Sequence, residues 1–350
     1  MFWNEEISIP ERITERNEMV RSTILKLGSL AAASLLTLSA CGVSNSGGSS
    51  GDDTDSAAGD KDWTACEPGS DSEDLDSLDP DDDKNVSFAV FNGWDETYAS
   101  VYALTNLLER DGYTVDIQEL EAGPAYQAVA VGDIDFHTDM MMPTTHASYY
   151  DSVKDDIDIL GCWYGAAQNT IAVNEDSPAQ SIEDLKDMAD EYDNTLYGIE
   201  AGAGLTKAVK DNVIPDYGLE QLEYKISSTP AMLAQVKKST DAGQNIAVTL
   251  WHPHWAYNKF PMRDLEDPKN SLGEKEILYN VGNKDSAEKF PYVAQAVKNF
   301  AMSEEQLADL EALMFSEDEY NGENLEDAVA EWLDDNPDFV DDYRAGDLAG

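Results

Sequence analysis

From residue 87 onward the chain alternates short apolar runs with amphipathic helical stretches, and this alternation limits the folds that it can adopt. Apolar runs at 87–91, 114–120 and 133–136 are typical of strands, and the stretches 97–110 and 123–131 between them have apolar residues at helical spacing. Strands that alternate with helices in this way form a right-handed parallel α/β sheet. The sequence therefore predicts an α/β fold.

The same pattern starts again at Ser181-Ile182-Glu183-Asp184, which has the form of a helix capping box. The strands predicted after it are 196–199, 222–226 and 246–250, with helices at 204–213 and 230–238. A last strand at 277–281 precedes helices at 285–301, 303–316 and 324–348. If these helices pack on the first unit, the chain crosses near 172–176 and 272–278. This predicts lobe I at 86–172 plus 278–350, lobe II at 173–277, and a cleft between them.

The charge of the chain excludes one class of partner. Its 71 Asp and Glu residues outnumber its 22 Lys and Arg residues, which gives a formal net charge of −49. Such a field repels nucleic acids, so no nucleic-acid partner is expected. The apolar content of 42% is ordinary for a globular protein, so a core can still form. The charge fits a salt-adapted organism and equally fits a solvating coat.

The amino terminus predicts export. The apolar run 27–40 follows Arg21 and Lys26 and is too short to span a bilayer, but it suits a signal peptide, which we place at 1–40 with a possible true start at Met19. The run ends in Leu-Ser-Ala-Cys-Gly at 38–42, which resembles the lipobox of prokaryotic lipoproteins. That resemblance implies lipidation of Cys41 and an anchor on the outer face of the cell membrane. An ordinary secretory signal with an incidental cysteine is the alternative.

Residues 42–85 hold 14 acidic residues and two lysines with almost no apolar periodicity. Such a composition cannot bury enough surface to order itself. The segment 41–85 is therefore predicted to be a lipidated cysteine followed by a flexible acidic linker.

Two further cysteines, Cys66 and Cys162, remain in a chain predicted to be exported to an oxidising compartment. We expect them to form a disulfide that holds 63–68 against the folded body. Two free thiols are the alternative.

The sequence offers little for catalysis. It has no phosphate-binding loop with its lysine and no Cys-x-x-Cys. His252-Pro253-His254 is a weak metal motif, because this spacing does not require both rings to converge on one ion. We therefore expect no enzyme activity, no cofactor and no metal.

Aromatic residues follow two of the predicted strands, at the end of an α/β sheet where ligands bind. Trp94 comes just after the first strand, and Trp251 begins the run Trp-His-Pro-His-Trp just after 246–250. Across a cleft the two indoles would face each other. A third element is the glycine-rich turn 198–206, which leads from a strand into a helix whose first N–H groups can bind an anion.

At these residues the chain resembles the glycine-betaine-binding lipoproteins of ABC importers, the osmoprotectant-binding family. The resemblance covers about 86–315, and its motifs are Gly-Pro-Ala-Tyr-Gln at 123–127, Gly-Asp-Ile-Asp at 132–135, Pro-Thr-Thr-His at 143–146, 181–185, the turn 198–204, 251–255 and 265–269. It implies a type II solute-binding fold, two α/β lobes joined by two crossover segments. It also implies a monomer that binds a zwitterionic or cationic osmolyte and works with an ABC permease and its ATPase.

The resemblance also implies ligand-binding residues. Trp94 and Trp251 correspond to walls of an aromatic cage for a trimethylammonium group, and the backbone N–H groups of Gly204 and Leu205 with the imidazole of His146 hold a carboxylate.

One position departs from the family: Met141 stands where a tryptophan is common, and methionine has no aromatic face. Either the thioether completes the cage or another ring, such as Trp255 or Tyr126, takes part. Alternative ligands are choline, carnitine, proline betaine and ectoine. An extracytoplasmic enzyme or a sensor module is the alternative outside transport.

Overall fold

The computed structural model describes residues 61–316 and 318–348. The predicted signal peptide with its alternative start, the lipidation site Cys41 and the first part of the linker all fall within 1–60, outside the described residues. Among the helices that are described, none combines the length and the apolar character needed to cross a bilayer.

The described residues form alternating strands and helices. The strands are β1 (Asn85–Phe91), β2 (Thr114–Leu120), β3 (Phe136–Met142), β4 (Ile157–Asn174), β5 (Thr195–Gly198), β6 (Glu223–Ile226), β7 (Ala247–His252), β8 (Met262–Asp264) and β9 (Glu276–Asn283). The α-helices are α1 (Asp95–Arg110), α2 (Ala122–Val131), α3 (Ala147–Val153), α4 (Gly204–Ala208), α5 (Ile214–Tyr217), α6 (Thr229–Asp241), α7 (Ala256–Lys259), α8 (Lys284–Lys289), α9 (Pro291–Asn299), α10 (Glu304–Phe315), α11 (Leu325–Asp335) and α12 (Pro337–Ala345).

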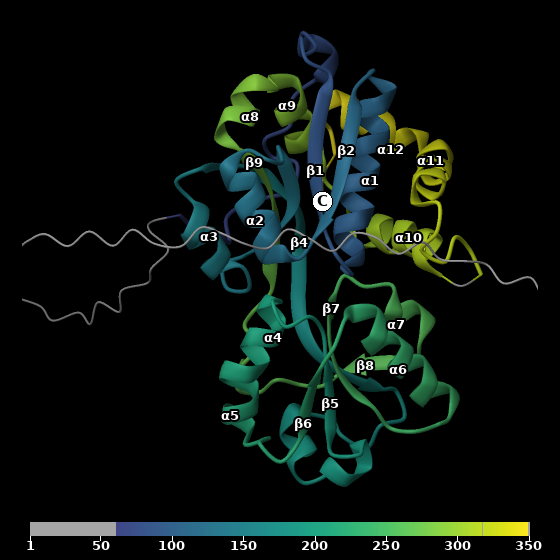
Figure 1. The fold of residues 1–350 in the computed structure, drawn as a ribbon. Coiled ribbons are helices and arrows are strands. Elements are labelled where there is room, and N and C mark those ends of the chain that lie inside the picture. Colours follow the sequence, from purple (N-terminus) through teal and green to yellow (C-terminus); the bar gives the residue numbers. More distant parts are fainter. Residues whose placement is uncertain (1–60, 317, 349–350) are drawn as a thin grey trace, which may run out of the picture. The chain divides into compact units, whose positions relative to one another are not determined.

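The strands pair in the order β2-β1-β3-β9-β4-β7-β5-β6, and β8 pairs with β4. β1 is parallel to β2 and β3, and β5 is parallel to β6 and β7. β9 is antiparallel to β3 and to β4, and β4 is antiparallel to β7. The elements around β1, β2, β3 and β9 are called lobe I here, and those around β5 to β8 lobe II (Figure 1). The α/β class predicted from the sequence is confirmed.

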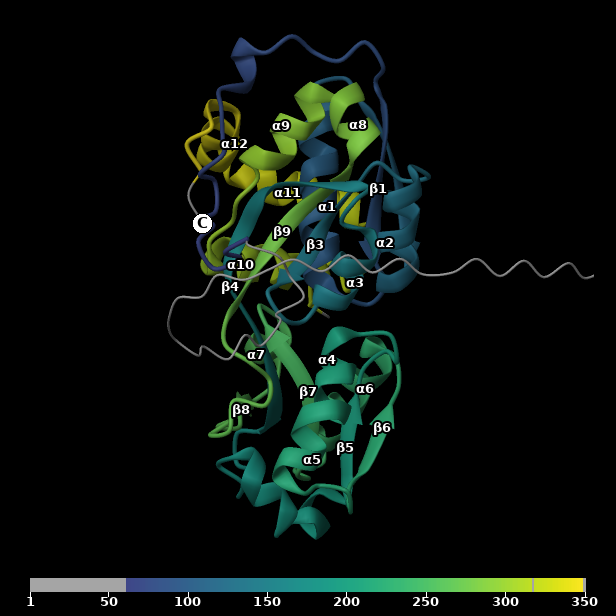
Figure 2. The same ribbon diagram turned by 90° about the vertical axis from the view of Figure 1, so that its left-hand side faces the viewer.

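The strand β4 belongs to both lobes. Its residues Ile157 to Ala167 pair with β9, and Gln168 to Val173 pair with β7. Figure 2 shows β4 running from lobe I into lobe II. β4 changes its partner between Ala167 and Gln168, and the chain returns to lobe I through β9, which begins at Glu276.

Three strands, β3, β4 and β8, differ from the sequence prediction, and the short β8 was not predicted. The third strand was placed at 133–136, but β3 begins at Phe136 and runs to Met142, because Gly132 with φ 78° ends α2 and a turn follows. β4 was not predicted at all. Its pairing with β9 is interrupted by register shifts, and Gly161 and Gly165 break the alternation of side chains. The sheet is consequently mixed rather than parallel.

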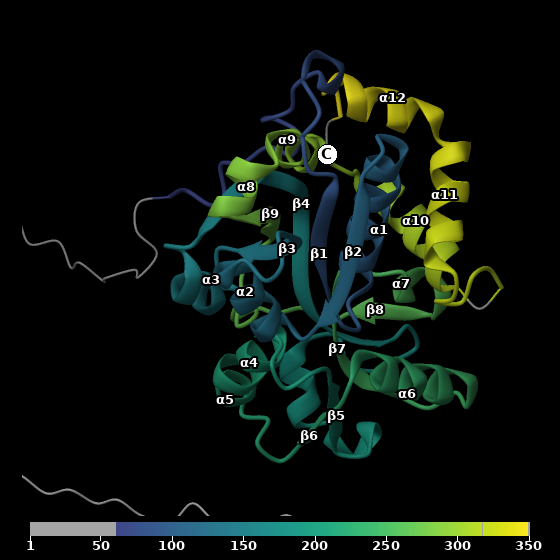
Figure 3. The same cartoon turned by 45° about the horizontal axis from the view of Figure 1, so that its top comes forward.

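The carboxyl-terminal helices pack on lobe I. α10 and α11 contact α1, and α9 contacts β4 and β9 (Figure 3). The helices predicted at 285–301 and 324–348 are each divided in two, at Pro291 and Pro337. A proline lacks the N–H that would continue a helix through it, so each proline starts a new helix instead.

The predicted linker is too long at its carboxyl end. Residues 61–85 pack against the body: Trp63 is buried, its ring contacts Tyr150 and Tyr279, and its carbonyl oxygen accepts from the Tyr279 hydroxyl at 2.6 Å. Cys66 is joined to Cys162 of β4 by a disulfide. The composition argument failed here because a few anchoring side chains order an otherwise acidic segment.

Candidate ligand-binding site

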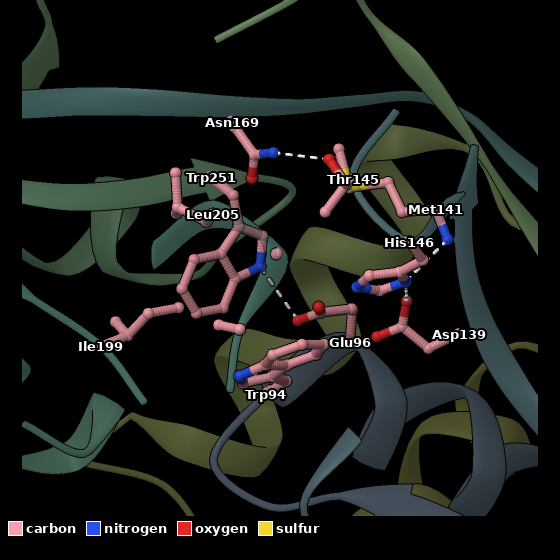
Figure 4. A pocket seen from close by; sticks show the side chains of 12 residues that line it. Trp94, Glu96, Asp139, Met141, Thr145, His146, Asn169, Ile199, Leu205 and Trp251 are labelled. Carbon is pink, nitrogen blue, oxygen red and sulfur yellow. Dashed lines mark hydrogen bonds and ion pairs between the residues drawn. The ribbon is translucent and has the colours of Figure 1, made fainter. Parts of the chain in front are cut away.

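A small cavity is lined by residues of both lobes (Figure 4). The lining residues are Trp94, Glu96, Asp139, Met141, Thr145, His146, Asn169, Ile199, Ala203, Gly204, Leu205 and Trp251. Six of the seven residues predicted to bind ligand are in this set, and the seventh, Trp255, is not. The polar side chains of Glu96, Asp139, Thr145 and Asn169 were not predicted.

The two cavity tryptophans are held by strand ends in different lobes. Trp94 is the last residue before α1, just after β1, and Trp251 lies near the end of β7. The turn before Trp94 requires glycine, because Gly93 has φ 86° and a Cβ there would lie 3.1 Å from Glu200 Oε1 of lobe II. The ends of β1 and β7 therefore place one indole from each lobe on the same cavity.

Each indole N–H is bonded to a carboxylate of the opposite lobe. Trp251 Nε1 donates to Glu96 Oε2 at 3.1 Å, and Trp94 Nε1 donates to Glu200 Oε2 at 3.4 Å. Trp94 also stacks on the ring of His146, with 5.6 Å between ring centres and 9° between planes. Both indoles are 6–7% exposed. Their orientations are thus set by contacts on several sides.

His146 is a neutral hydrogen-bond donor on the cavity wall. Its Nδ1 accepts from the backbone N–H of Met141 at 3.0 Å, which places the ring proton on Nε2. Burial lowers the pKa of His146 to about 3, so the ring stays uncharged at neutral pH. In Figure 4 Nε2 lies on the cavity side of the ring.

The glycine-rich turn approaches lobe I closely. Gly204 and Leu205 open α4, where backbone N–H groups have no acceptor within the helix. A Cβ at Gly204 would lie 2.3 Å from the carbonyl oxygen of Thr145, so only glycine allows this approach. Thr145 is itself held in place, because its hydroxyl accepts from Asn169 Nδ2 at 2.7 Å and its N–H donates to Glu276 Oε2 at 3.0 Å.

Met141 lines the cavity from β3 and is 7% exposed. It occupies the position where the resemblance led us to expect an aromatic ring, and Trp255 does not take its place. Tyr126 does not line the cavity either: it is fully buried, and its hydroxyl donates to the carbonyl oxygen of Asp139 at 3.1 Å. The described cavity therefore has two tryptophan walls and a thioether.

Two carboxyl groups in the cavity were missed by the sequence analysis. Glu96 lies in the first turn of α1, two residues after Trp94, and Asp139 lies in β3, two residues before Met141. Burial raises the pKa of Asp139 to about 7. Burial, and then the nearby charge of Asp139, raise the pKa of Glu96 well above its usual range. Both groups therefore hold protons more tightly than ordinary carboxylic acids.

Trp255 contributes to a contact between lobes outside the cavity. Its Nε1 donates to the Asp95 carboxylate of α1, and burial raises the pKa of Asp95 to about 7. His254 Nε2 lies 3.8 Å from the same carboxylate, whereas His252 Nε2 lies 2.8 Å from Asp264 Oδ2. The two imidazoles of the His-Pro-His run thus face different partners.

Comparison with known proteins identifies the family. The family described as the substrate binding domain of ABC-type glycine betaine transport systems matches residues 84–335. The glycine betaine/carnitine transport binding protein GbuC of Listeria monocytogenes serotype 1/2a (strain 10403S) is 34% identical over 163 residues, which are 46% of this chain and 52% of that protein. The chain thus matches about half the length of this relative.

Two crystal structures resemble about three quarters of the chain. Lactococcal OpuAC, in its closed-liganded conformation complexed with glycine betaine, is 28% identical with a TM-score of 0.68, over 75% of this chain and 99% of that one. The glycine betaine, L-proline-binding protein ProX from Borrelia burgdorferi is 26% identical with a TM-score of 0.69, over 76% and 100%. These relatives are binding proteins rather than enzymes, and they confirm the predicted type II solute-binding fold. The chain belongs to the family of substrate-binding domains of ABC-type glycine betaine transport systems.

Proposed function

We propose that this chain is the substrate-binding protein of an ABC importer and that it binds glycine betaine or a related quaternary-ammonium solute. The observation that carries the proposal is that Trp94 and Trp251, one from each lobe, line a single cavity with the neutral imidazole of His146. The match of residues 84–335 to the family supports the same function. In this proposal Cys41 carries the lipid anchor, and the protein works as a monomer on the outer face of the cell membrane.

The aromatic walls suit a trimethylammonium group. Its positive charge is diffuse, its surface is apolar and it has no N–H to donate, so it gains most from the faces of aromatic rings. Each such contact contributes up to about 2 kcal/mol when water is excluded. Trp94 and Trp251 are both nearly buried, so the contacts that they offer are in a largely desolvated site.

Other groups on the cavity wall suit a carboxylate. The Nε2–H of His146 and the backbone N–H groups of Gly204 and Leu205 are hydrogen-bond donors without positive charge. A carboxylate taken out of water needs such donors, because an unpaired buried charge is costly. The cavity thus offers separate contacts for the two ends of a zwitterion.

Contacts between lobes provide a way for binding to stabilise a closed form. The bonds from Trp251 to Glu96 and from Trp94 to Glu200 each join the lobes, as does the bond from the Tyr149 hydroxyl to the Gly202 carbonyl. A ligand held between the indoles would favour the conformation in which these bonds form. In this proposal 86–172 plus 278–350 and 173–277 move as two lobes, and the permease and its ATPase recognise their closed arrangement.

Isothermal titration of the full chain with glycine betaine and with choline tests the proposal. The titration should be run at about 1 M salt, where the screening length of about 3 Å weakens the self-repulsion of an acidic chain. We expect saturable binding of at least one of the two ligands. Trp251→Leu should weaken it by about 1 kcal/mol or more, while the aromatic control Trp251→Phe should keep most of it. A folded protein that binds neither ligand would contradict the proposed function.

A second candidate ligand class follows from a specific observation. Met141 replaces an expected aromatic wall, and two carboxyl groups, Glu96 and Asp139, line the same cavity. Both features favour a quaternary-ammonium ligand other than glycine betaine. Which of these ligands binds best depends on the charge of the cavity.

A further inference from the structure

The cavity contains acidic groups but no lysine or arginine side chain. Among its twelve lining residues are two carboxylic acids, Glu96 and Asp139, and no lysine or arginine. Both acids come from lobe I, and each is at most 5% exposed. A ligand in this cavity therefore meets carboxyl groups that no protein cation on its walls compensates.

The hydrogen bonds of the two acids are incomplete. Glu96 Oε2 accepts from Trp251, but Asp139 Oδ2 is buried without any hydrogen-bond partner among the described residues. Asp139 Oδ1 lies 3.8 Å from His146 Nδ1, and this nitrogen carries no proton to donate because it accepts from the Met141 N–H. An ionised Asp139 would thus be a buried charge with little local compensation.

The groups packed around the pair do not supply positive charge either. The charge of Glu311 from α10 acts on Glu96. Both carboxyl oxygens of Glu311 are buried without a hydrogen-bond partner in the described part of the chain, and burial raises the pKa of Glu311 well above the usual range. Asp95, next to Glu96 on α1, is another acid of low exposure, with 13% of its side chain accessible. His137 and His146 face Asp139 from β3 and the turn after it, and burial lowers the pKa of each to about 3, so both remain neutral. Because no lysine or arginine is among the lining residues, the carboxyl pair is more stable in its protonated form.

We propose that the carboxyl pair of Glu96 and Asp139 determines the charge of the ligand, so that this cavity prefers a quaternary-ammonium cation without a carboxylate, of the choline class, over glycine betaine. The inference rests on the proposed function and specifies its substrate class. A cationic ligand supplies the positive charge that the walls lack, and the pair ionises beside it. The proton that leaves the pair goes to the solvent.

A zwitterion gains less from the same groups. The carboxylate of glycine betaine would share the cavity with Glu96 and Asp139, and like charges at close range repel one another. It therefore binds best when the pair keeps its protons, and its binding releases none. The affinity for choline should rise with pH, while the affinity for glycine betaine should stay constant or fall.

Titrations of the full chain with choline and with glycine betaine between about pH 5.5 and about pH 8 test this inference. Buffers of different ionisation enthalpy count the protons released on binding. We expect the ratio of choline affinity to glycine betaine affinity to rise about tenfold or more across this range, with proton release on choline binding only. Choline binding without proton release and without pH dependence would overturn the inference, and so would binding of glycine betaine alone at every pH.

Two variants assign the effect to the pair. Glu96→Gln keeps an oxygen to accept from Trp251, and at about pH 8 it should weaken choline binding at least about tenfold while changing glycine betaine binding less than about threefold. Asp139→Asn should reduce the pH dependence. The control is Glu200→Gln, which removes a carboxylate that also accepts from a cavity tryptophan but does not line the cavity.

Glu200→Gln should change the affinity for both ligands by the same factor and leave the proton release intact. Equal effects of Glu96→Gln and Glu200→Gln on the preference would overturn the inference. If neither ligand binds to the folded wild-type protein, the proposed function itself fails. If glycine betaine binds and choline is not preferred, the proposed function stands. Only the role given to the carboxyl pair is then contradicted.

Discussion

The wall of the cavity that lobe I provides differs in chemistry from the wall that lobe II provides. Lobe I contributes all three titratable lining groups, Glu96, Asp139 and His146, together with Trp94 and Met141. Lobe II contributes an indole, small apolar residues and the start of α4 with its free N–H groups. Lobe I therefore supplies the groups that respond to the charge of a ligand, while lobe II supplies apolar contacts, an aromatic face and neutral hydrogen-bond donors.

This difference predicts two kinds of variant. Changes in lobe I should alter which ligand is preferred, because they alter the charge or the faces that meet the head group. Changes in lobe II that prevent the lobes from approaching should weaken every ligand alike.

The largest effect is expected for Gly204→Ala in lobe II. A Cβ at this position would lie 2.3 Å from the Thr145 carbonyl oxygen of lobe I, so the lobes must separate to accept it. Overpacking of this kind costs about 1–3 kcal/mol, and we expect both choline and glycine betaine to lose affinity by that amount in titrations.

Gly202→Ala is the matched control in the same turn, because a Cβ there would have only one neighbour, the Tyr149 hydroxyl at 3.8 Å. It should bind both ligands almost as the wild type does. A change of ligand preference in Gly204→Ala, rather than a uniform loss, would contradict the role given to lobe II.

A smaller effect is expected for Met141→Trp in lobe I. The substitution adds an aromatic face where the thioether now lines the cavity, and one cation–π contact contributes about 0.5–2 kcal/mol. Titration should show tighter binding of glycine betaine if the cavity keeps the geometry of its family. Weaker binding would instead show that the residues around Met141 have reshaped this part of the wall.

Much of the site was predictable because strand ends in α/β folds place side chains at a shared edge. That rule found Trp94 and Trp251 without knowledge of the fold. It did not exclude Trp255, which lies only four positions after Trp251. The indole of Trp255 instead donates to the Asp95 carboxylate outside the cavity. Sequence proximity to a site residue was a weaker guide than position at the strand end.

The acidic pair was not predictable for a different reason. With 71 acidic residues in the chain, an additional carboxylate near a tryptophan carries no signal in the sequence. Only burial distinguishes Glu96 and Asp139 from the many solvated acids. The strand β4 was missed for a comparable reason, since its glycines and register shifts remove the alternation on which strand prediction depends.

The smallest effect expected is on stability. Asp95 and Asp139 have pKa values raised to about 7 by burial, so between about pH 4 and pH 7 the folded state binds more protons at these groups than the unfolded state does. Their contribution to the free energy of unfolding must then fall as the pH rises through this window. We expect thermal unfolding to show a lower melting temperature at about pH 8 than at about pH 5.

Asp139→Asn removes one of these groups and should raise the melting temperature at the higher pH more than at the lower. The exposed Asp133→Asn removes the same charge without the burial and serves as its control. An equal effect of the two variants would show that the net charge of the chain, rather than the buried acids of lobe I, governs the pH dependence.

The central claim is that the cavity between Trp94 and Trp251 recognises the positive charge of a quaternary-ammonium head group. The most direct measurement compares choline with 3,3-dimethylbutan-1-ol, in which a neutral carbon replaces the nitrogen, by isothermal titration of the full chain. The account predicts that choline binds at least about tenfold more tightly, because only the cation gains from the indole faces and the carboxyl pair. Equal affinity for the two compounds, or binding of neither, would contradict it.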